Sequence, residues 1–243
     1  MRRTAKRAMA GETVKCEAVC LSVRPWSRTS HVVSWLAPHG KIVTSVKGAV
    51  RPKSAFLGQY DLNYTCEIVY YARAKGEIHA LRECTPISMR EALRGDFRAL
   101  AVAGYCRALV ERFAPHGEEC AEWLSMLTDS LDRLSSGLVS PEAAVSEMLF
   151  LDMKALAMLG LRPEVESLSG AFLLRGERSL PVSEGVAALL CAIARSSSPL
   201  PSGLQVALDA ARVIGIYYTI HLDLPPDARR AVLGLVSRTA KKG

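Results

Sequence analysis

Two short basic segments hold the side chains of this sequence that are best suited to binding chemistry. One runs from Arg24 to Ser30 and the other from Val46 to Ser54, and neither contains an acidic residue. Arg and Lys neutralise phosphates and release counterions, so several together bind a polyanion with little sequence preference. The candidate phosphate-binding residues are Arg24, Arg28, Lys41, Lys47, Arg51 and Lys53.

Aromatic residues near these cations could add a surface on which bases stack. Trp26 falls in the first basic segment, which we expect to form a turn, whereas Trp35 falls in a β-branched run typical of a strand. The adjacent Tyr70 and Tyr71 must point to opposite faces of their strand. We therefore take Trp26 as the candidate stacking residue. The alternative is a solvated rim of charge around a core that contains the aromatic residues.

The charge of the chain is unevenly distributed. Residues 1–91 contain 15 Lys and Arg against 7 Asp and Glu, a net +8, whereas residues 92–243 contain 16 against 17, a net −1. This asymmetry favours polyanion binding by the N-terminal half. The alternative is that the protein is basic but has no polyanion partner.

No catalytic or metal-binding pattern is evident. The histidines are single and none pairs with a Cys or another His at ligand spacing, so we expect no metal. There is no Gly-x-Ser-x-Gly, and Gly40-Lys41 lacks the glycine and the hydroxyl residue of a phosphate loop. Asp152, on an apolar helix, is expected to be buried against an Arg rather than to act as an acid or base. We predict that the protein is not an enzyme and needs no cofactor.

The elements that must position the basic segments are short strands. Five are expected between residues 13 and 84. They include a hairpin that turns at Pro38-His39-Gly40-Lys41, and a long strand from Asp61 to Ala72 that is followed by a second turn at 73–76. Five strands in so short a stretch, with no helical period between most of them, suit a small closed barrel of the OB type. We therefore assign residues 1–12 to a basic N-terminal segment and residues 13–87 to an OB-fold domain.

Residues 88–243 have a helical period. Phe97, Leu100, Ala101, Gly104 and Ala108 are expected to line one buried face, and Leu124, Leu127, Leu131 and Leu134 another. Ser140 and Ser183 are expected N-caps, and Gly160 a helix end. Residues 161–182 lose the period and suggest a short irregular lobe or small hairpin. The predicted class is α+β, with a five-stranded barrel followed by a helical bundle.

The seven cysteines are odd in number and form no Cys-x-x-Cys pair, which indicates a reduced protein rather than a disulfide scaffold. The charged N-terminus lacks the apolar run of a signal peptide, and no apolar stretch is long enough to span a membrane. We expect a cytoplasmic protein that makes no membrane contact.

Arg-Pro-Trp-Ser-x-Thr-Ser at 24–30, His-Gly-Lys at 39–41 and Val-Lys-Gly-Ala-x-Arg-Pro-Lys-Ser at 46–54 resemble, in order and spacing, the RecO family of bacterial recombination mediators. A Leu-Gly pattern follows at 57–62. The stretch from Leu151-Asp152 to Leu159-Gly160, and the helix start at Val182-Ser183, are also similar to that family. The resemblance is strongest in residues 16–85.

The resemblance implies an OB-fold followed by a helical domain. It implies binding of single-stranded and double-stranded DNA, annealing of complementary strands, and loading of recombinase onto strands coated by single-strand binding protein. RecR and the acidic, hydrophobic C-terminal tail of the single-strand binding protein are the implied partners, and association with the nucleoid would follow.

One departure from the family concerns residues 161–182. Many members carry a four-cysteine zinc lobe after the Leu-Gly stretch, and these residues contain no Cys. We therefore expect the zinc lobe to be absent. Two other functions remain open: an RNA-binding OB-fold adaptor, and an interaction scaffold whose basic rim docks an acidic protein.

Overall fold

The computed structural model describes residues 11–73, 78–116, 119–137, 139–168, 171–175, 179–224 and 227–240. The contacts divide the chain into two compact units, Met1–Glu91 with Arg107–Asp132, and Ala92–Cys106 with Arg133–Gly243. None of the described helices combines the length and apolar content needed to cross a membrane. The basic segment 1–12 and the turn at 73–76 lie largely outside the described residues.

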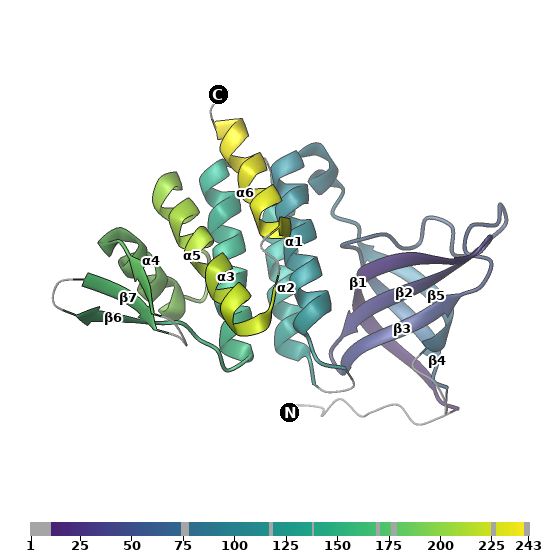
Figure 1. The fold of residues 1–243 in the computed structure, drawn as a ribbon. Helices are drawn as coiled ribbons and strands as arrows, with labels where there is room; N and C mark the ends of the chain where they lie inside the picture. The colour runs from purple at the N-terminus through teal and green to yellow at the C-terminus, as the bar shows by residue number, and fades with distance from the viewer. Residues whose placement is uncertain are drawn as a thin grey trace. The chain divides into compact units, whose positions relative to one another are not determined.

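The first unit contains a closed five-stranded barrel with the strand order β1-β2-β3-β5-β4. Its strands are β1 (Thr13–Ser27), β2 (Ser30–Ala37), β3 (Gly40–Val46), β4 (Thr65–Tyr71) and β5 (Ile78–Ser88). All neighbours are antiparallel except β3 and β5, whose parallel pairing closes the barrel (Figure 1). The predicted five-stranded OB-type barrel is confirmed.

The strand ends differ from the prediction in three places. β1 continues through Ser27, so Trp26 lies at the end of a strand and the turn consists of Arg28 and Thr29. Lys41 is not in the hairpin turn but in β3, opposite Leu36. β4 begins only at Thr65, because Tyr64 N–H donates to the Asp61 carbonyl and Asn63 has a φ of +68°, which bends the chain before the strand.

The barrel core explains which aromatic residues face solvent. Trp35 is fully buried, and its indole N–H donates to Thr44 Oγ1 at 2.8 Å, which satisfies the one polar atom of the ring. Tyr70 is buried and Tyr71 is exposed, as the alternation of a strand requires. Trp26 is 68% exposed. The preference for Trp26 over Trp35 as the exposed tryptophan is confirmed.

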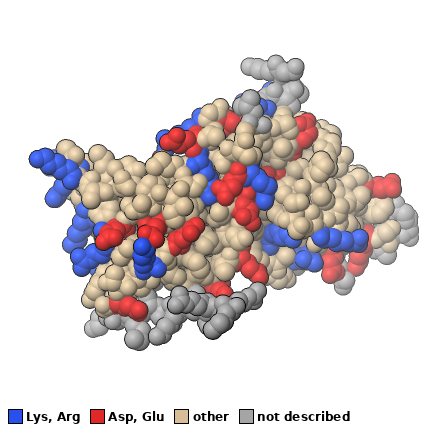
Figure 2. Space-filling view, turned by 180° about the vertical axis from the view of Figure 1, so that it is seen from behind, with Lys and Arg blue, Asp and Glu red and all other residues tan. Residues whose placement is uncertain are grey.

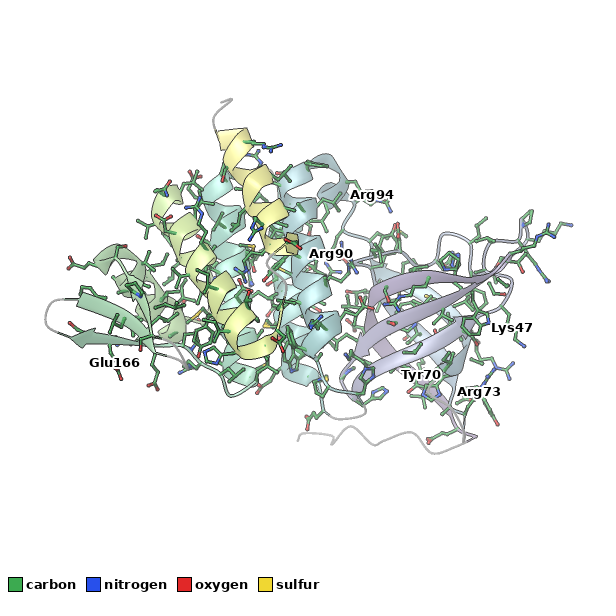
Figure 3. All side chains as sticks on the ribbon, in the orientation of Figure 1. Lys47, Tyr70, Arg73, Arg90, Arg94 and Glu166 are labelled. Carbon is green, nitrogen blue, oxygen red and sulfur yellow. The ribbon has the colours of Figure 1, made fainter. Side chains whose placement is uncertain are left out.

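Two further segments of the first unit contact the barrel. One is Arg107–Phe113, the last part of helix α1 (Phe97–Phe113), in which the Arg107 guanidinium donates to the Leu21 carbonyl. Cys120 N–H, just before α2 (Ala121–Ser135), donates to the Pro38 carbonyl at 2.7 Å. Arg90 is buried and binds the Asn63 carbonyl, Thr65 Oγ1 and Asp132 Oδ1 (labelled in Figure 3). That cation therefore serves the fold rather than a ligand.

The second unit is mostly helical. Besides η1 (Glu91–Gly95) and the first half of α1, its helices are α3 (Pro141–Met158), α4 (Glu184–Arg195), α5 (Leu204–Leu222) and α6 (Asp227–Ala240). α3 packs against α4, α5 and α6 (Figure 1). Ser140 and Ser183 accept N-capping hydrogen bonds from Ala143 and Val186, and Gly160 has a φ of +73° just beyond α3. Both predicted caps and the helix end are confirmed.

The buried face predicted for α1 is wrong. Phe97 and Leu100 are exposed by 68% and 39%, and the buried residues of this helix are instead Ala99, Val102, Ala103, Tyr105, Cys106, Leu109 and Val110. α1 has apolar residues at helical spacing on more than one face, so the period alone could not choose between them. For α2, the predicted face is right at Leu127, Leu131 and Leu134, which are buried.

A buried ion pair and its hydrogen bonds join four helices of the second unit. Arg229 on α6 contacts Asp152 Oδ2 on α3 at 2.5 Å, and Tyr105 on α1 donates its hydroxyl to Asp152 Oδ1 at 2.8 Å. Arg229 also donates to the Ala211 carbonyl on α5. Burial alone would lower the pKa of Arg229, but the Asp152 carboxylate raises it, so the guanidinium stays charged. The structural role predicted for Asp152 is therefore confirmed.

Residues 161–182 are more regular than predicted. They form a three-stranded antiparallel sheet of β6 (Glu164–Leu168), β7 (Ala171–Arg175) and β8 (Leu180–Val182), in that order. Of the two predicted forms, the small hairpin is thus closer to the observed sheet than the irregular lobe is. β6 and β7 lie against α4.

Candidate nucleic-acid interface

The two basic segments are held together by backbone hydrogen bonds. Gly48 N–H donates to Ser30 Oγ and Val50 N–H donates to the Thr29 carbonyl, each at 3.3 Å. A third bond, from Arg51 N–H to the Gly48 carbonyl, closes the turn that follows β3. The loop after β3 is therefore fixed against the β1–β2 hairpin, and residues distant in sequence meet at one edge of the barrel.

At that edge lies a groove of about 690 Å³, the basic groove, whose lining includes Trp26, Ser30, Val32, Lys47, Arg51 and Arg73. Three cations and one exposed indole thus surround a single depression, and none of the described residues that line it is acidic. Lys47 and Arg73 are labelled on the barrel in Figure 3. A cationic groove with one aromatic face can hold a phosphodiester while a base stacks.

Arg73 was missed by the sequence analysis. It directly follows the end of β4, outside both basic segments, and reaches the groove because β3 and β5 pair in parallel next to the β4–β5 connection. The Arg73 N–H donates to His79 Nδ1, and Ser45, which also lines the groove, donates its hydroxyl to the His79 carbonyl. The only sequence signal was its place in the turn predicted at 73–76.

His79 belongs to a stack of rings behind the groove. Its imidazole stacks on Tyr70 with 5.2 Å between ring centroids, and the Tyr70 hydroxyl is 3.0 Å from His39 Nε2. Burial lowers the pKa of His39, and the neighbouring His79 lowers it further. Burial and the Arg73 charge likewise lower the pKa of His79. Both rings are therefore neutral near pH 7.

Two of the predicted phosphate contacts lie elsewhere. Arg24 pairs with Glu111 Oε1 at 3.3 Å, and Lys41 donates its ammonium group to the Glu111 carbonyl at 2.7 Å. Lys41 N–H also donates to the Pro115 carbonyl. Burial lowers the pKa of Lys41, against the opposing effect of Glu111. Neither residue lines the basic groove.

The remaining predicted residues divide between the groove and its surroundings. Trp26, Lys47 and Arg51 line the groove, whereas Arg28, at the tip of the hairpin, and Lys53, in the following loop, are exposed outside its lining. Figure 2 shows Lys and Arg gathered at one end of the barrel, with acidic residues along its side. That end is the most strongly basic part of the surface in this view.

Two thiols of the barrel are unreactive. Burial raises the pKa of Cys16 to about 12 and that of Cys20 further, so these thiols stay protonated and unreactive. In the described part of the chain, no three His, Cys, Asp or Glu side chains lie together in a way that could hold a metal ion. What the groove can do is bind.

Comparison with known proteins agrees with this architecture. The family model "Recombination protein O C terminal" matches residues 94–170. A "DNA repair protein RecO" from Geobacter metallireducens is 26% identical over 62% of this chain and 60% of its own, and one from Desulforudis audaxviator is 31% identical over 63% and 59%. One from Myxococcus xanthus is 26% identical over 91% of this chain and 88% of its own.

The chain is thus similar to proteins of the RecO family. The expected resemblance to this family is confirmed, and the family model includes the helical stretch from Leu151-Asp152 to Leu159-Gly160. The alignments with the first two relatives span about three fifths of those proteins' length. A solved aspartyl tRNA synthetase from Entamoeba histolytica matches with a TM-score of only 0.28 and 12% identity, over 63% of this chain and 35% of its own, which is too low to inform the fold.

Proposed function

We propose that this chain acts in DNA repair and recombination by binding single-stranded DNA in the basic groove of its barrel. The observation that carries the proposal is the convergence of exposed Trp26 with Lys47, Arg51 and Arg73 in one groove. Phosphate contacts position a strand and stacking accepts any base, so neither demands a particular sequence. Arg28 and Lys53 would extend the phosphate contacts beyond the groove.

Such a site suits a protein that anneals complementary strands. Cations reduce the repulsion between two phosphate backbones, and a site that does not read base edges leaves them free to pair. Annealing of this kind needs no cofactor and no catalytic residue. We propose that the protein also helps to load recombinase onto strands coated by single-strand binding protein, with RecR as its partner, and that it binds duplex DNA through the same cations. A protein with this function would associate with the nucleoid.

The decisive experiment is a strand-annealing assay on complementary oligonucleotides coated with single-strand binding protein, with and without RecR. We expect the wild-type chain to anneal them and the Lys47→Ala/Arg51→Ala variant to do so several-fold more slowly. Annealing at the uncatalysed rate by the wild-type chain, in both conditions, would refute the mediator function. Equal rates for wild type and variant would move the binding site away from the groove.

The same assay separates the two other functions. An RNA-binding adaptor would bind oligoribonucleotides at physiological salt but would not anneal coated DNA. A scaffold that docks an acidic protein would bind neither oligonucleotide directly under these conditions. The similarity to RecO proteins and the exposed indole in the groove favour the DNA-binding function over both.

A second groove supports a site for the acidic, apolar tail of the single-strand binding protein. About 370 Å³ in volume, it lies between α5 and α6 and is lined by Ile216, Ile220 and Leu233, with Arg212 and Arg230 beside them. Ile216 is half-exposed although it is a large apolar residue. Apolar side chains of a peptide would enter this groove while its carboxylates meet the arginines.

Titration of a fluorescent tail peptide into the full chain tests this site. We expect Ile216→Glu to weaken binding at least tenfold, because it places a carboxylate where apolar side chains would pack. Leu57→Glu, an exposed apolar residue on the barrel loop, is the matched control and should bind as the wild type does. Equal affinity for both variants would exclude this groove as the tail site.

A further inference from the structure

Gly48 is the residue on which the shape of the basic groove depends most directly. Its φ of +68° lies in the left-handed region, which side chains other than glycine rarely adopt. It directly follows Lys47, its N–H is bound by Ser30 Oγ, and its carbonyl accepts from Arg51 N–H. Every one of these contacts involves a residue that lines the groove.

The missing side chain of Gly48 leaves room for Arg51. A Cβ added at Gly48 would lie 3.2 Å from Arg51 Cδ, which is tighter than most packing contacts, and 3.4 Å from its Nε. The aliphatic part of Arg51 therefore lies directly over the Gly48 backbone. Any other residue at position 48 would press its Cβ on the aliphatic part of Arg51, which would have to shift by a few tenths of an ångström.

We infer that Gly48 is a positioning residue for nucleic-acid binding, which acts by holding the Arg51 guanidinium in the basic groove. This inference rests on the proposed function, because it concerns the same groove. Ser30 supports Gly48 by fixing its N–H, so the β1–β2 hairpin also determines where Arg51 lies. Neither Gly48 nor Ser30 needs to touch the nucleic acid itself.

Another glycine of the same loop provides a matched control. Gly58 has a φ of +74°, close to that of Gly48, but an added Cβ would meet no atom within 4 Å. Gly58→Ala therefore introduces the same kind of backbone strain as Gly48→Ala without pressing on Arg51. A difference in binding between the two variants reports the contact with Arg51 and not the strain.

The experiment measures binding of oligodeoxythymidylate to the full chain as a function of salt. Losing one single-strand phosphate contact reduces the slope of log affinity against log salt by about 0.7, which corresponds to about fivefold weaker binding near 0.1 M salt. We expect Gly48→Ala to show this loss and Gly58→Ala to match the wild type. Circular dichroism and thermal unfolding of both variants establish that they are folded.

A double variant shows whether Gly48 acts through Arg51. If it does, Gly48→Ala should cost about fivefold in the wild-type background and close to nothing in an Arg51→Ala background. Equal losses in both backgrounds, or equal binding by the Gly48→Ala and Gly58→Ala variants, would overturn the inference. Failure of the wild-type chain to bind the oligonucleotide would refute the proposed function instead, so the two failures are distinguishable.

Discussion

The backbone N–H of Gly48 donates a hydrogen bond to Ser30 Oγ at 3.3 Å, and this contact joins two basic turns that are separate in the sequence. Lys47 and Arg51 belong to the loop after β3 and Trp26 to the β1–β2 hairpin, and the bond from Val50 N–H to the Thr29 carbonyl joins the same two segments. With these two bonds, all three side chains line one groove. A sequence-tolerant binding site is thus built from a side chain–backbone contact between loops and not from a motif in one segment.

Trp26 should report binding directly. Of the three tryptophans, Trp35 and Trp123 are buried and only Trp26 is exposed. We expect addition of oligodeoxythymidylate to quench the intrinsic fluorescence, and Trp26→Ala to weaken binding by about 1–3 kcal/mol, the usual value of one stacked base. Trp26→Phe should retain part of the affinity. Unchanged fluorescence on saturation, together with full affinity of the alanine variant, would exclude stacking at this position.

The cations outside the groove should contribute less than those inside it. Arg24→Ala removes a cation that is already paired with Glu111. We therefore expect the slope of log affinity against log salt to fall by less than about 0.35, half the value for one phosphate contact. Lys47→Ala should reduce the slope by about 0.7. Titrations of both variants at several salt concentrations compare the two. A larger decrease in slope for Arg24→Ala than for Lys47→Ala would indicate that the binding site includes the surface around Arg24 and Glu111.

The buried ion pair of the helical unit should dominate its stability. Asp152→Ala leaves the Arg229 guanidinium buried without its partner, so the free energy of unfolding should fall by about 3–5 kcal/mol. Arg212→Ala breaks only an exposed pair with Asp209 and should cost less than about 1 kcal/mol. Urea unfolding monitored by circular dichroism measures both. Comparable losses in the two variants would show that the buried pair is no more important than a surface one.

Acidic pH should destabilise the barrel through its histidines. The pKa values of His39 and His79 lie below their usual 6.5 in the folded chain, so the unfolded chain takes up protons first as the pH falls. Stability is therefore constant above about pH 6.5 and decreases below it, through the lowered pKa values of the folded state. Thermal unfolding of the wild type between pH 7.5 and 5 measures this loss.

The variant His39→Gln/His79→Gln is the control for that effect. It should lose less stability than the wild type over the same range, because neither replacement titrates. A pH profile with the same slope in both proteins would assign the acid sensitivity to other groups.

The sequence was sufficient for features that depend on local pattern. Alternation and turn residues predicted the barrel strands, and Ser140, Ser183 and Gly160 predicted helix ends, because caps and turns depend on a few neighbouring residues. The burial of Asp152 against an Arg followed from one acid on an apolar helix. The exposure of Trp26 was predicted from its place in a basic segment expected to form a turn, although the residue lies at the end of β1.

Features that depend on contacts between residues far apart in the sequence could not be predicted from local pattern. Arg73 joins the groove through the parallel pairing of β3 with β5, which no local pattern encodes. Lys41 has the charge of a binding residue, but Glu111 and Pro115, which are far along the chain, occupy its polar groups. The buried face of α1 likewise depends on distant contacts, since Tyr105 on that face bonds Asp152 of α3.

The measurement that tests the central claim most directly is the salt dependence of oligodeoxythymidylate binding by the wild type and by the variant Lys47→Ala/Arg51→Ala/Arg73→Ala. If the basic groove holds the strand, the slope of log affinity against log salt should fall by about 2 in the triple variant, from three lost phosphate contacts. A slope equal to that of the wild type, in a variant that is folded, would contradict the assignment of the groove as the nucleic-acid site.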